Sequence, residues 1–178
     1  MKKRAKKVNK VSFDLREVKA DWFVSTFGKD SKEWKQAEDA CRKSAIPIDL
    51  WQLDLEDLRL LMEGKRPNKI QVSTDLSVWE YFLLIRVGEF VQEFFHILEG
   101  FTIKQSVEEQ IASNGLPKLN GTEGILIFVR SYFGLRSFSD AEKITLADVY
   151  LAKKDAYIQG MFERRYNKQI ENKYKVKK

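Results

Sequence analysis

The chain has few of the residues on which disulfides, metal centres and many active sites depend. Cys41 is the only cysteine and His96 the only histidine among 178 residues. A single cysteine excludes an intramolecular disulfide and a cysteine-rich zinc site. The sequence has no Gly-x-x-x-x-Gly-Lys-Ser/Thr phosphate loop and no Gly-x-Ser-x-Gly motif of a nucleophilic serine. We therefore expect a protein that is not an enzyme and that binds no cofactor or metal.

Histidine and cysteine both have simple interpretations here. Glu93 and His96, three residues apart, resemble half of a di-iron ligand set, but the other half would need a second histidine. Together with Arg86 and Glu89 they recur every three or four residues, which is typical of the solvated stripe of a helix. Cys41 lies in a helical pattern, where a free cysteine usually acts as a small apolar residue.

A membrane span is also missing. The longest apolar stretch, residues 78–101, is long enough to cross a bilayer but contains six ionisable residues: Glu80, Arg86, Glu89, Glu93, His96 and Glu99. Each charge at the bilayer centre costs about 2.5 to 3.5 kcal/mol, so this stretch predicts a buried helix of a water-soluble fold. The basic N-terminus is not followed by the apolar run of a signal peptide, so we expect a cytoplasmic location.

Net positive charge is confined to the two ends of the chain. Residues 1–10 contain six basic residues and no acidic one, and residues 150–178 contain nine basic and three acidic residues. Residues 11–149 contain 17 basic and 23 acidic residues, so the body is acidic although the whole chain is +6. Two basic ends predict contacts with an anionic partner, either nucleic acid or an acidic protein surface.

Apolar spacing of three and four residues predicts a mainly α fold, an irregular multi-helix bundle with little or no β structure. In the N-terminal part we expect helices over 13–27, 32–45 and 48–62, with Gly28 ending the first and Asp30 or Ser31 capping the second. Residues 63–69, with one glycine and one proline, predict a loop and a seam between subdomains. We accordingly divide the chain into a basic arm (1–10), an N-terminal helical subdomain (11–63), a central core (70–160) and a C-terminal tail (161–178).

The central core should form around a buried helix over about 76–98, capped by Asp75, with Gly88 as the position where this helix can bend. A short strand at 70–73 and a helix over 103–112 are further expectations. Two Asn-Gly pairs, at 114–115 and 120–121, indicate turns and permit a small hairpin. The apolar run 125–129 fits a buried strand or a buried helix, and its continuation to Gly134 favours the helix.

Thr145 and Asp148 resemble an N-terminal capping pair of a last helix over 146–174. At 100° per residue, Val149, Tyr150, Tyr157 and Met161 lie on the face of Leu146, whereas the apolar residues from Phe162 onward lie on another. The distal part therefore is a basic amphipathic helix facing away from the core, or is kinked at Gly160, or folds back on the domain. The predicted docking residues are Phe162, Tyr166, Ile170 and Tyr174.

Basic side chains opposite this apolar stripe, and those of the N-terminal arm, are the predicted contacts to an anion or an acidic partner. They are Lys2, Lys3, Arg4, Lys6, Lys7, Lys10, Arg164, Arg165, Lys168 and Lys175.

In overall character the chain resembles small structural or assembly proteins of tailed bacteriophages. The resemblance lies in the all-helical body, the basic arm and a long C-terminal helix that reads TLADVYLAKKDA over 145–156 and ends in lysines. It carries over no functional residue. It implies a non-enzymatic component of a virion, in the head-tail or tail region, that contacts its own copies and other subunits in the host cytoplasm and then in the particle. The alternative is a nucleic-acid-binding regulator that uses its basic termini.

Overall fold

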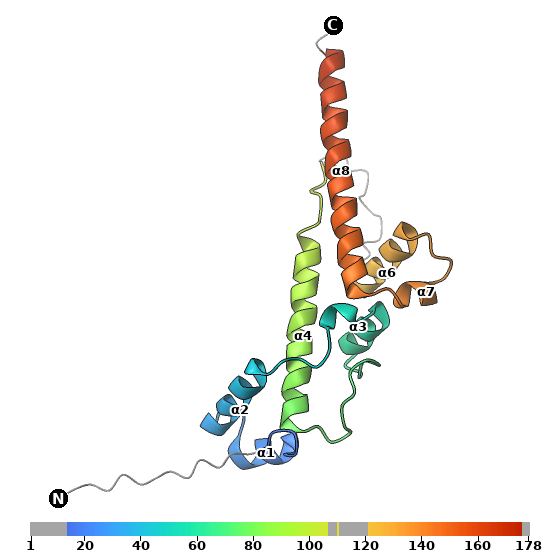
Figure 1. Cartoon of the computed structure of the whole chain (residues 1–178). Helices are drawn as coiled ribbons and strands as arrows, with labels where there is room; N and C mark the ends of the chain where they lie inside the picture. The colour runs from blue at the N-terminus through green and yellow to red at the C-terminus, as the bar shows by residue number, and fades with distance from the viewer. Residues whose placement is uncertain (1–13, 107–109, 111–120, 176–178) are drawn as a thin grey trace, which may run out of the picture. The chain divides into compact units, whose positions relative to one another are not determined.

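The structure is a computed structural model that describes residues 14–106, 110 and 121–175. Within these residues the chain forms seven α-helices and one 3₁₀ helix, and no strand (Figure 1). The mainly α prediction, including a long C-terminal helix, is confirmed. The elements are α1 (Ala20–Phe27), α2 (Lys32–Lys43), η1 (Leu50–Gln52), α3 (Leu55–Met62), α4 (Val78–Glu99), α6 (Gly121–Tyr132), α7 (Phe138–Glu142) and α8 (Leu146–Lys175).

The chain divides into two compact units, each made of two separate stretches. The first unit joins the residues up to 46 with 72–86, and the second joins 47–71 with 87–178. Helix α4 contributes to both, whereas the sequence predicted consecutive subdomains at 11–63 and 70–160. Each unit is described below by itself.

The core of the first unit is formed by α1, α2 and the beginning of α4. Phe23, Trp34 and Phe82 pack their rings together, with Trp34 at 6.0 Å from Phe23 and 4.9 Å from Phe82 between ring centroids. Trp34 and Cys41 lie on the buried face of α2. Ser31 caps this helix by accepting a hydrogen bond from the backbone N–H of Trp34, which confirms the predicted start.

The predicted helix over 13–27 is wrong in its first half, because α1 begins only at Ala20. The backbone before it pairs with the start of α4 instead of with itself. The carbonyls of Leu15 and Val18 accept hydrogen bonds from the N–H groups of Trp79 and Val78, and an antiparallel bridge joins Lys19 to Ser77. These partners lie about sixty positions away in sequence, so a local apolar pattern could not reveal them.

Helix α4 is close to its predicted bounds, but its cap is not Asp75. The Oγ of Ser77 accepts a hydrogen bond from the backbone N–H of Glu80, and a carboxylate oxygen of Glu80 accepts one from the N–H of Ser77. This reciprocal pair is a capping box. Asp75 instead accepts a charged hydrogen bond from Lys19 at 2.7 Å. Gly88 lies inside the uninterrupted helix.

The prediction of a single helix over 48–62 is wrong, because the structure has two separate elements there, η1 and α3. The break falls at Leu53 and Asp54, where the backbone turns to pair with a distant segment. The N–H of Leu146 donates to the carbonyl of Leu53, and the N–H of Leu55 donates to the carbonyl of Ile144. Asp54 then caps α3 by accepting from the N–H of Asp57. Gly64, with φ of 69°, follows the end of α3 as the loop prediction required.

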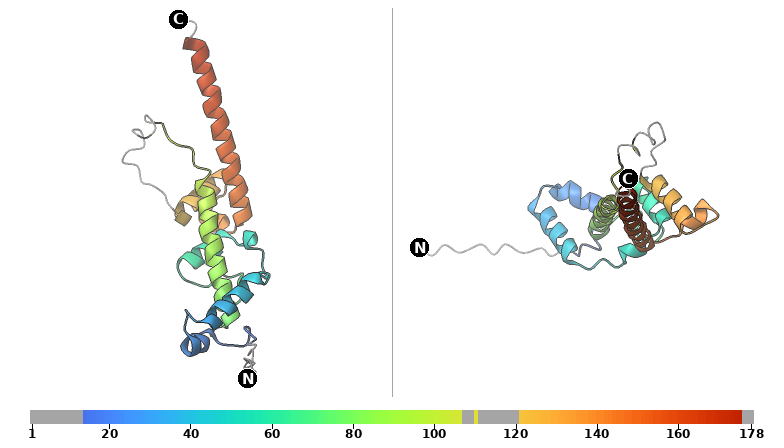
Figure 2. Two further views of the ribbon diagram at one scale, coloured as in Figure 1. Left: turned by 90° about the vertical axis from the view of Figure 1, so that its left-hand side faces the viewer. Right: turned by 90° about the horizontal axis from the view of Figure 1, so that it is seen from above.

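The second unit is assembled on α8. Helix α6 packs on α8, and α7 packs on α6 and α3 (Figure 2). Trp51 lies between α4 and α8, with ring centroids 5.3 Å from Phe90 and 5.6 Å from Tyr150. The choice of helix for residues 125–129 is confirmed by α6, in which Ile125 and Val129 are buried.

The remaining secondary-structure predictions fare differently. Residues 70–73 form no strand, and β pairing in the described residues is limited to two isolated bridges. Residues 103–106, the beginning of the helix predicted over 103–112, are irregular. Most of the remainder of that helix and the turns predicted at 114–115 and 120–121, apart from Gly121 at the start of α6, lie outside the described residues.

Candidate docking surface on the C-terminal helix

The first two turns of α8 are buried in the second unit. Thr145 caps the helix by accepting a hydrogen bond from the N–H of Asp148, as its sequence predicted. Leu146 and Val149 are completely buried, and Ala152 nearly so. This end of α8 is therefore fixed by packing.

Polar contacts with α6 fix the orientation of the next turns. The Lys153 ammonium lies 3.9 Å from the ring centroid of Phe128, and burial lowers the pKa of Lys153. The hydroxyl of Tyr132 donates a hydrogen bond to the Asp155 carboxylate, which also accepts one from Gln159. The bond to this carboxylate raises the pKa of Tyr132.

Residues 101–106 run along α8 and contact it between Tyr150 and Arg164. The ring of Phe101 lies against Tyr150 and Tyr157. A Cβ added to Gly160 would come within 2.5 Å of the Ile103 side chain, so the absence of a side chain at 160 allows this close approach. Further along, Arg164 donates a hydrogen bond to the carbonyl of Lys104.

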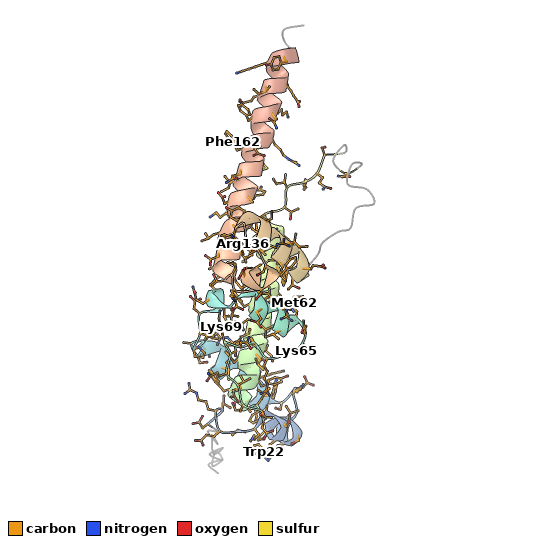
Figure 3. The ribbon with its side chains drawn as sticks, turned by 90° about the vertical axis from the view of Figure 1, so that its right-hand side faces the viewer. Trp22, Met62, Lys65, Lys69, Arg136 and Phe162 are labelled. Atoms are coloured by element: carbon orange, nitrogen blue, oxygen red, sulfur yellow. The ribbon has the colours of Figure 1, made fainter. Side chains whose placement is uncertain are left out.

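Beyond this segment α8 is covered by little of its own unit. Every side chain over 162–174 is exposed except that of Ile170, which is half-buried. Phe162 is 68% exposed, and Figure 3 shows it projecting from the helix. Its ring stacks on that of Tyr166, with centroids 6.1 Å apart and an angle of 14° between planes. The helix is uninterrupted through Gly160.

The predicted docking residues thus share one row of the helix. We call this row, formed by Phe162, Tyr166, Ile170 and Tyr174, the distal ridge. Its members are four residues apart, so each lies one turn beyond the last and about 40° further round at 100° per residue. Large apolar side chains that stay in water on one face indicate a surface for another molecule.

Sequence reasoning missed two exposed apolar residues that precede the ridge, Leu151 and Ile158. They are 59% and 55% exposed and lie on the side of α8 that leads to Phe162. Leu151 lies seven residues before Ile158, and Ile158 lies four residues before Phe162, a spacing that could have revealed them. The sequence pattern alone did not single them out, because the first half of α8 is apolar on several sides. Only the packing of the structure shows which of these sides is covered.

The basic residues predicted to meet an anion have different positions. Arg165 and Lys168 are exposed, and Arg164 is exposed with its guanidinium bonded to the Lys104 carbonyl. Lys175 belongs to the last turn of α8. The other predicted contacts lie outside the described residues: Lys2, Lys3, Arg4, Lys6, Lys7 and Lys10.

Arg86 is not fully solvated, although the sequence placed it in the solvated stripe of its helix. It is half-buried in the first unit, and its guanidinium donates hydrogen bonds of 2.9 Å to the carbonyls of Cys41 and Ser44. Arg86 therefore binds the C-terminal end of α2, where backbone carbonyls lack partners within the helix. The Cys41 thiol is buried, and burial raises its pKa even though Arg86 acts in the opposite direction.

The other polar members of the stripe, Glu89, Glu93 and His96, are exposed on α4. His96 Nδ1 lies 3.8 Å from a Glu99 carboxylate oxygen, also at the surface. In the described parts of the chain, no three histidine, cysteine or acidic residues come together as metal ligands would. A search of the same parts finds no helix with the length and apolar character needed to cross a bilayer.

Comparison of the chain with protein-family models, curated proteins and solved structures finds no match. The distal ridge must therefore be interpreted from its own chemistry.

Proposed function

We propose that this protein is a non-enzymatic structural component of a large assembly and that it docks on neighbouring subunits through α8. The observation that carries the proposal is the distal ridge, a row of apolar side chains, all exposed except the half-buried Ile170, on a helix firmly packed at its other end. Solvent exposure of such a row is unfavourable, and burial against another protein removes that cost.

A tailed-phage particle is the assembly we propose first, on the resemblance in overall character alone. In that setting the chain would join its partners in the host cytoplasm and remain in the virion. The basic residues of the two ends would then contact acidic protein surfaces or packaged nucleic acid.

No catalytic role forms part of the proposal. The single histidine is exposed beside Glu99, and the single cysteine is buried with a raised pKa. A buried thiol with a raised pKa is a poor nucleophile, because the thiolate is the reactive form.

Fractionation by size of lysate from the cells that produce the protein tests the docking role. Tagged wild-type chain should elute in a large complex, and the double variant Phe162→Ser, Tyr166→Ser should elute as free protein. Met62→Ser is a matched control, because Met62 is also exposed, at 55%, but belongs to α3. Wild-type protein that elutes free, or a complex that survives the double substitution, would contradict the proposal.

A nucleic-acid-binding role is a second candidate, favoured by the side chains at the end of α8. Basic Arg165, Lys168 and Lys173 are exposed there and alternate with Tyr166 and Tyr174. Basic residues neutralise phosphates, and aromatic rings stack on bases. In a gel-shift assay at two salt concentrations, Arg165→Gln with Lys168→Gln should weaken binding and reduce its salt dependence. Wild-type protein that shifts no nucleic acid at low salt would exclude this role.

A further inference from the structure

We infer that a second copy of this chain occupies the distal ridge, with the two α8 helices side by side and parallel. This inference rests on the proposed function and names the partner that the ridge accepts. It is carried by the charges on the two sides of the ridge.

The ridge separates two flanks of opposite charge. At 100° per residue, Arg165, Gln169 and Lys173 follow one side of it, while Glu163, Asn167 and Glu171 follow the other. Each set is spaced by four residues, as the ridge is, and all six side chains are exposed. One flank is thus basic and the other acidic over the same turns of α8.

This arrangement is complementary to itself in one orientation only. When two identical helices pair in parallel, opposite flanks face each other across the apolar seam, as in parallel coiled coils. The basic flank of each copy then meets the acidic flank of the other. When the helices run antiparallel, equal flanks meet, so Arg165 and Lys173 would face the same basic residues, and the two glutamates would also face each other. Charge complementarity therefore favours the parallel pair.

The length of the contact follows from the spacing of the ridge. A row with four-residue spacing moves about 40° round the helix at each step, so two such rows separate within a few turns. The seam should centre on Tyr166 and Ile170, with Phe162 and Tyr174 at its ends. Leu151 and Ile158 should contribute less, because they lie further from this centre.

Arg164 and Lys168 lie on the side of α8 away from the ridge, on the same face as Tyr157 and the contact with 101–106. Pairing through the ridge leaves these two basic residues accessible. A pair of chains would present two such basic faces, so pairing and anion contact are compatible.

Sedimentation of the full-length chain at several concentrations tests the pairing. We expect a monomer–dimer equilibrium whose dissociation constant rises at least about tenfold in Phe162→Ser, Tyr166→Ser. Met62→Ser should leave this dissociation constant unchanged.

Arg165→Glu with Lys173→Glu makes both flanks acidic and should also weaken the dimer. A 1:1 mixture of this variant with Glu163→Lys, Glu171→Lys, in which both flanks are basic, should recover association.

Disulfide cross-linking tests the orientation. In a Cys41→Ala background, Tyr174→Cys should form a disulfide with the same residue of a second chain when the helices are parallel. A mixture of Phe162→Cys and Tyr174→Cys chains should cross-link preferentially to each other only when the helices are antiparallel. Preferential 162–174 linkage would overturn the parallel arrangement.

The outcomes separate the two proposals. A wild-type chain that stays monomeric at all concentrations, while its large complex in lysate still depends on Phe162 and Tyr166, would overturn pairing and leave docking on a different subunit. A dimer in vitro together with free protein in lysate would support pairing and contradict the larger assembly. A dimer unaffected by the ridge and flank substitutions would overturn the assignment of its interface to α8.

Discussion

At the scale of single residues, Arg86 shows how a charged side chain can stabilise the end of a helix. Arg86 donates to two carbonyls at the end of α2, and Cys41 is one of the residues whose carbonyl it binds. With a buried thiol and a raised pKa, Cys41 should resist a thiol reagent in the folded chain at pH 7 and react once the chain is unfolded in denaturant. Arg86→Met should accelerate the labelling of Cys41, because the carbonyls at the end of α2 lose the hydrogen bonds that Arg86 donates. Equal rates in native and unfolded protein would contradict this.

Glu80 links stability to pH. Although partial burial raises its pKa, hydrogen bonds from the Ser73 hydroxyl and from the N–H groups of Ser77 and Ser73 dominate and lower it to about 2. A depressed pKa in the folded state means stability that is complete above the unfolded value of 4.5 and is lost as the pH falls toward 2.

Glu80→Gln should therefore cost about 1 kcal/mol of unfolding free energy at pH 7, as loss of a helix cap does. The difference from wild type should shrink below pH 4. Thermal denaturation across this pH range measures it, and Asp39→Asn, an exposed carboxylate of α2, is the control. A cost that stays constant down to pH 2 would contradict the assigned pKa.

At the scale of elements, the loop after α3 is held by one buried carboxylate. Asp57 is completely buried, and its Oδ1 accepts hydrogen bonds from the N–H groups of Asn68 and Lys69, at 2.7 and 3.3 Å. Its Oδ2 has no hydrogen-bond partner in the described chain, but the Lys69 ammonium lies 3.8 Å away and also pairs with Asp54.

Asp57→Ala should lower the unfolding free energy by about 2 to 3 kcal/mol, because the N–H groups of Asn68 and Lys69 lose their buried acceptor. Asp57→Asn should cost less, since its amide oxygen can still accept. Urea denaturation measures the unfolding free energy of both variants, and equal losses would contradict the role of Oδ1 as the acceptor.

The close contact at Gly160 gives a prediction for α8. Alanine favours a helix over glycine by about 1 kcal/mol, but its Cβ would collide with the end of the Ile103 side chain. Gly160→Ala alone should therefore change stability little. In an Ile103→Val background, which removes the colliding methyl group, the same substitution should stabilise the chain by about 1 kcal/mol. Equal effects in both backgrounds, measured by urea denaturation, would contradict the contact.

Local signals in the sequence were sufficient where the chain's own neighbours decide its structure. Ser31, Thr145 and the glycines at 28 and 64 mark element ends correctly, because caps and turns depend on nearby residues. The helix predicted over 48–62 was wrong because Leu53 pairs with Leu146, far along the chain. Of the surface on α8, the ridge residues were predicted from their angular positions, whereas Leu151 and Ile158 required knowledge of what packing covers.

At the scale of the whole molecule, the inferred pair of chains should respond to salt with a defined sign. Glu163 and Glu171 supply the negative flank of each chain, which faces the positive flank of the other chain across the ridge. Salt screens the attraction between exposed opposite charges, so the dimer should dissociate more readily at high salt. Glu163→Gln with Glu171→Gln should weaken the dimer and remove most of this salt dependence. Sedimentation at low and high salt measures it, and an unchanged salt response in that variant would contradict the assignment.

The pairing of Val18 and Lys19 with the start of α4 also constrains how the protein is made. The ion pair between Lys19 and Asp75 spans 56 positions, and the first unit has no complete core until Val78 and Phe82 join it. During synthesis, α1 and α2 leave the ribosome before α4, so the core of the first unit cannot form until the beginning of α4 has been synthesised. Contacts so distant in sequence form slowly, so Phe23 and Trp34 stay accessible to chaperones during that interval.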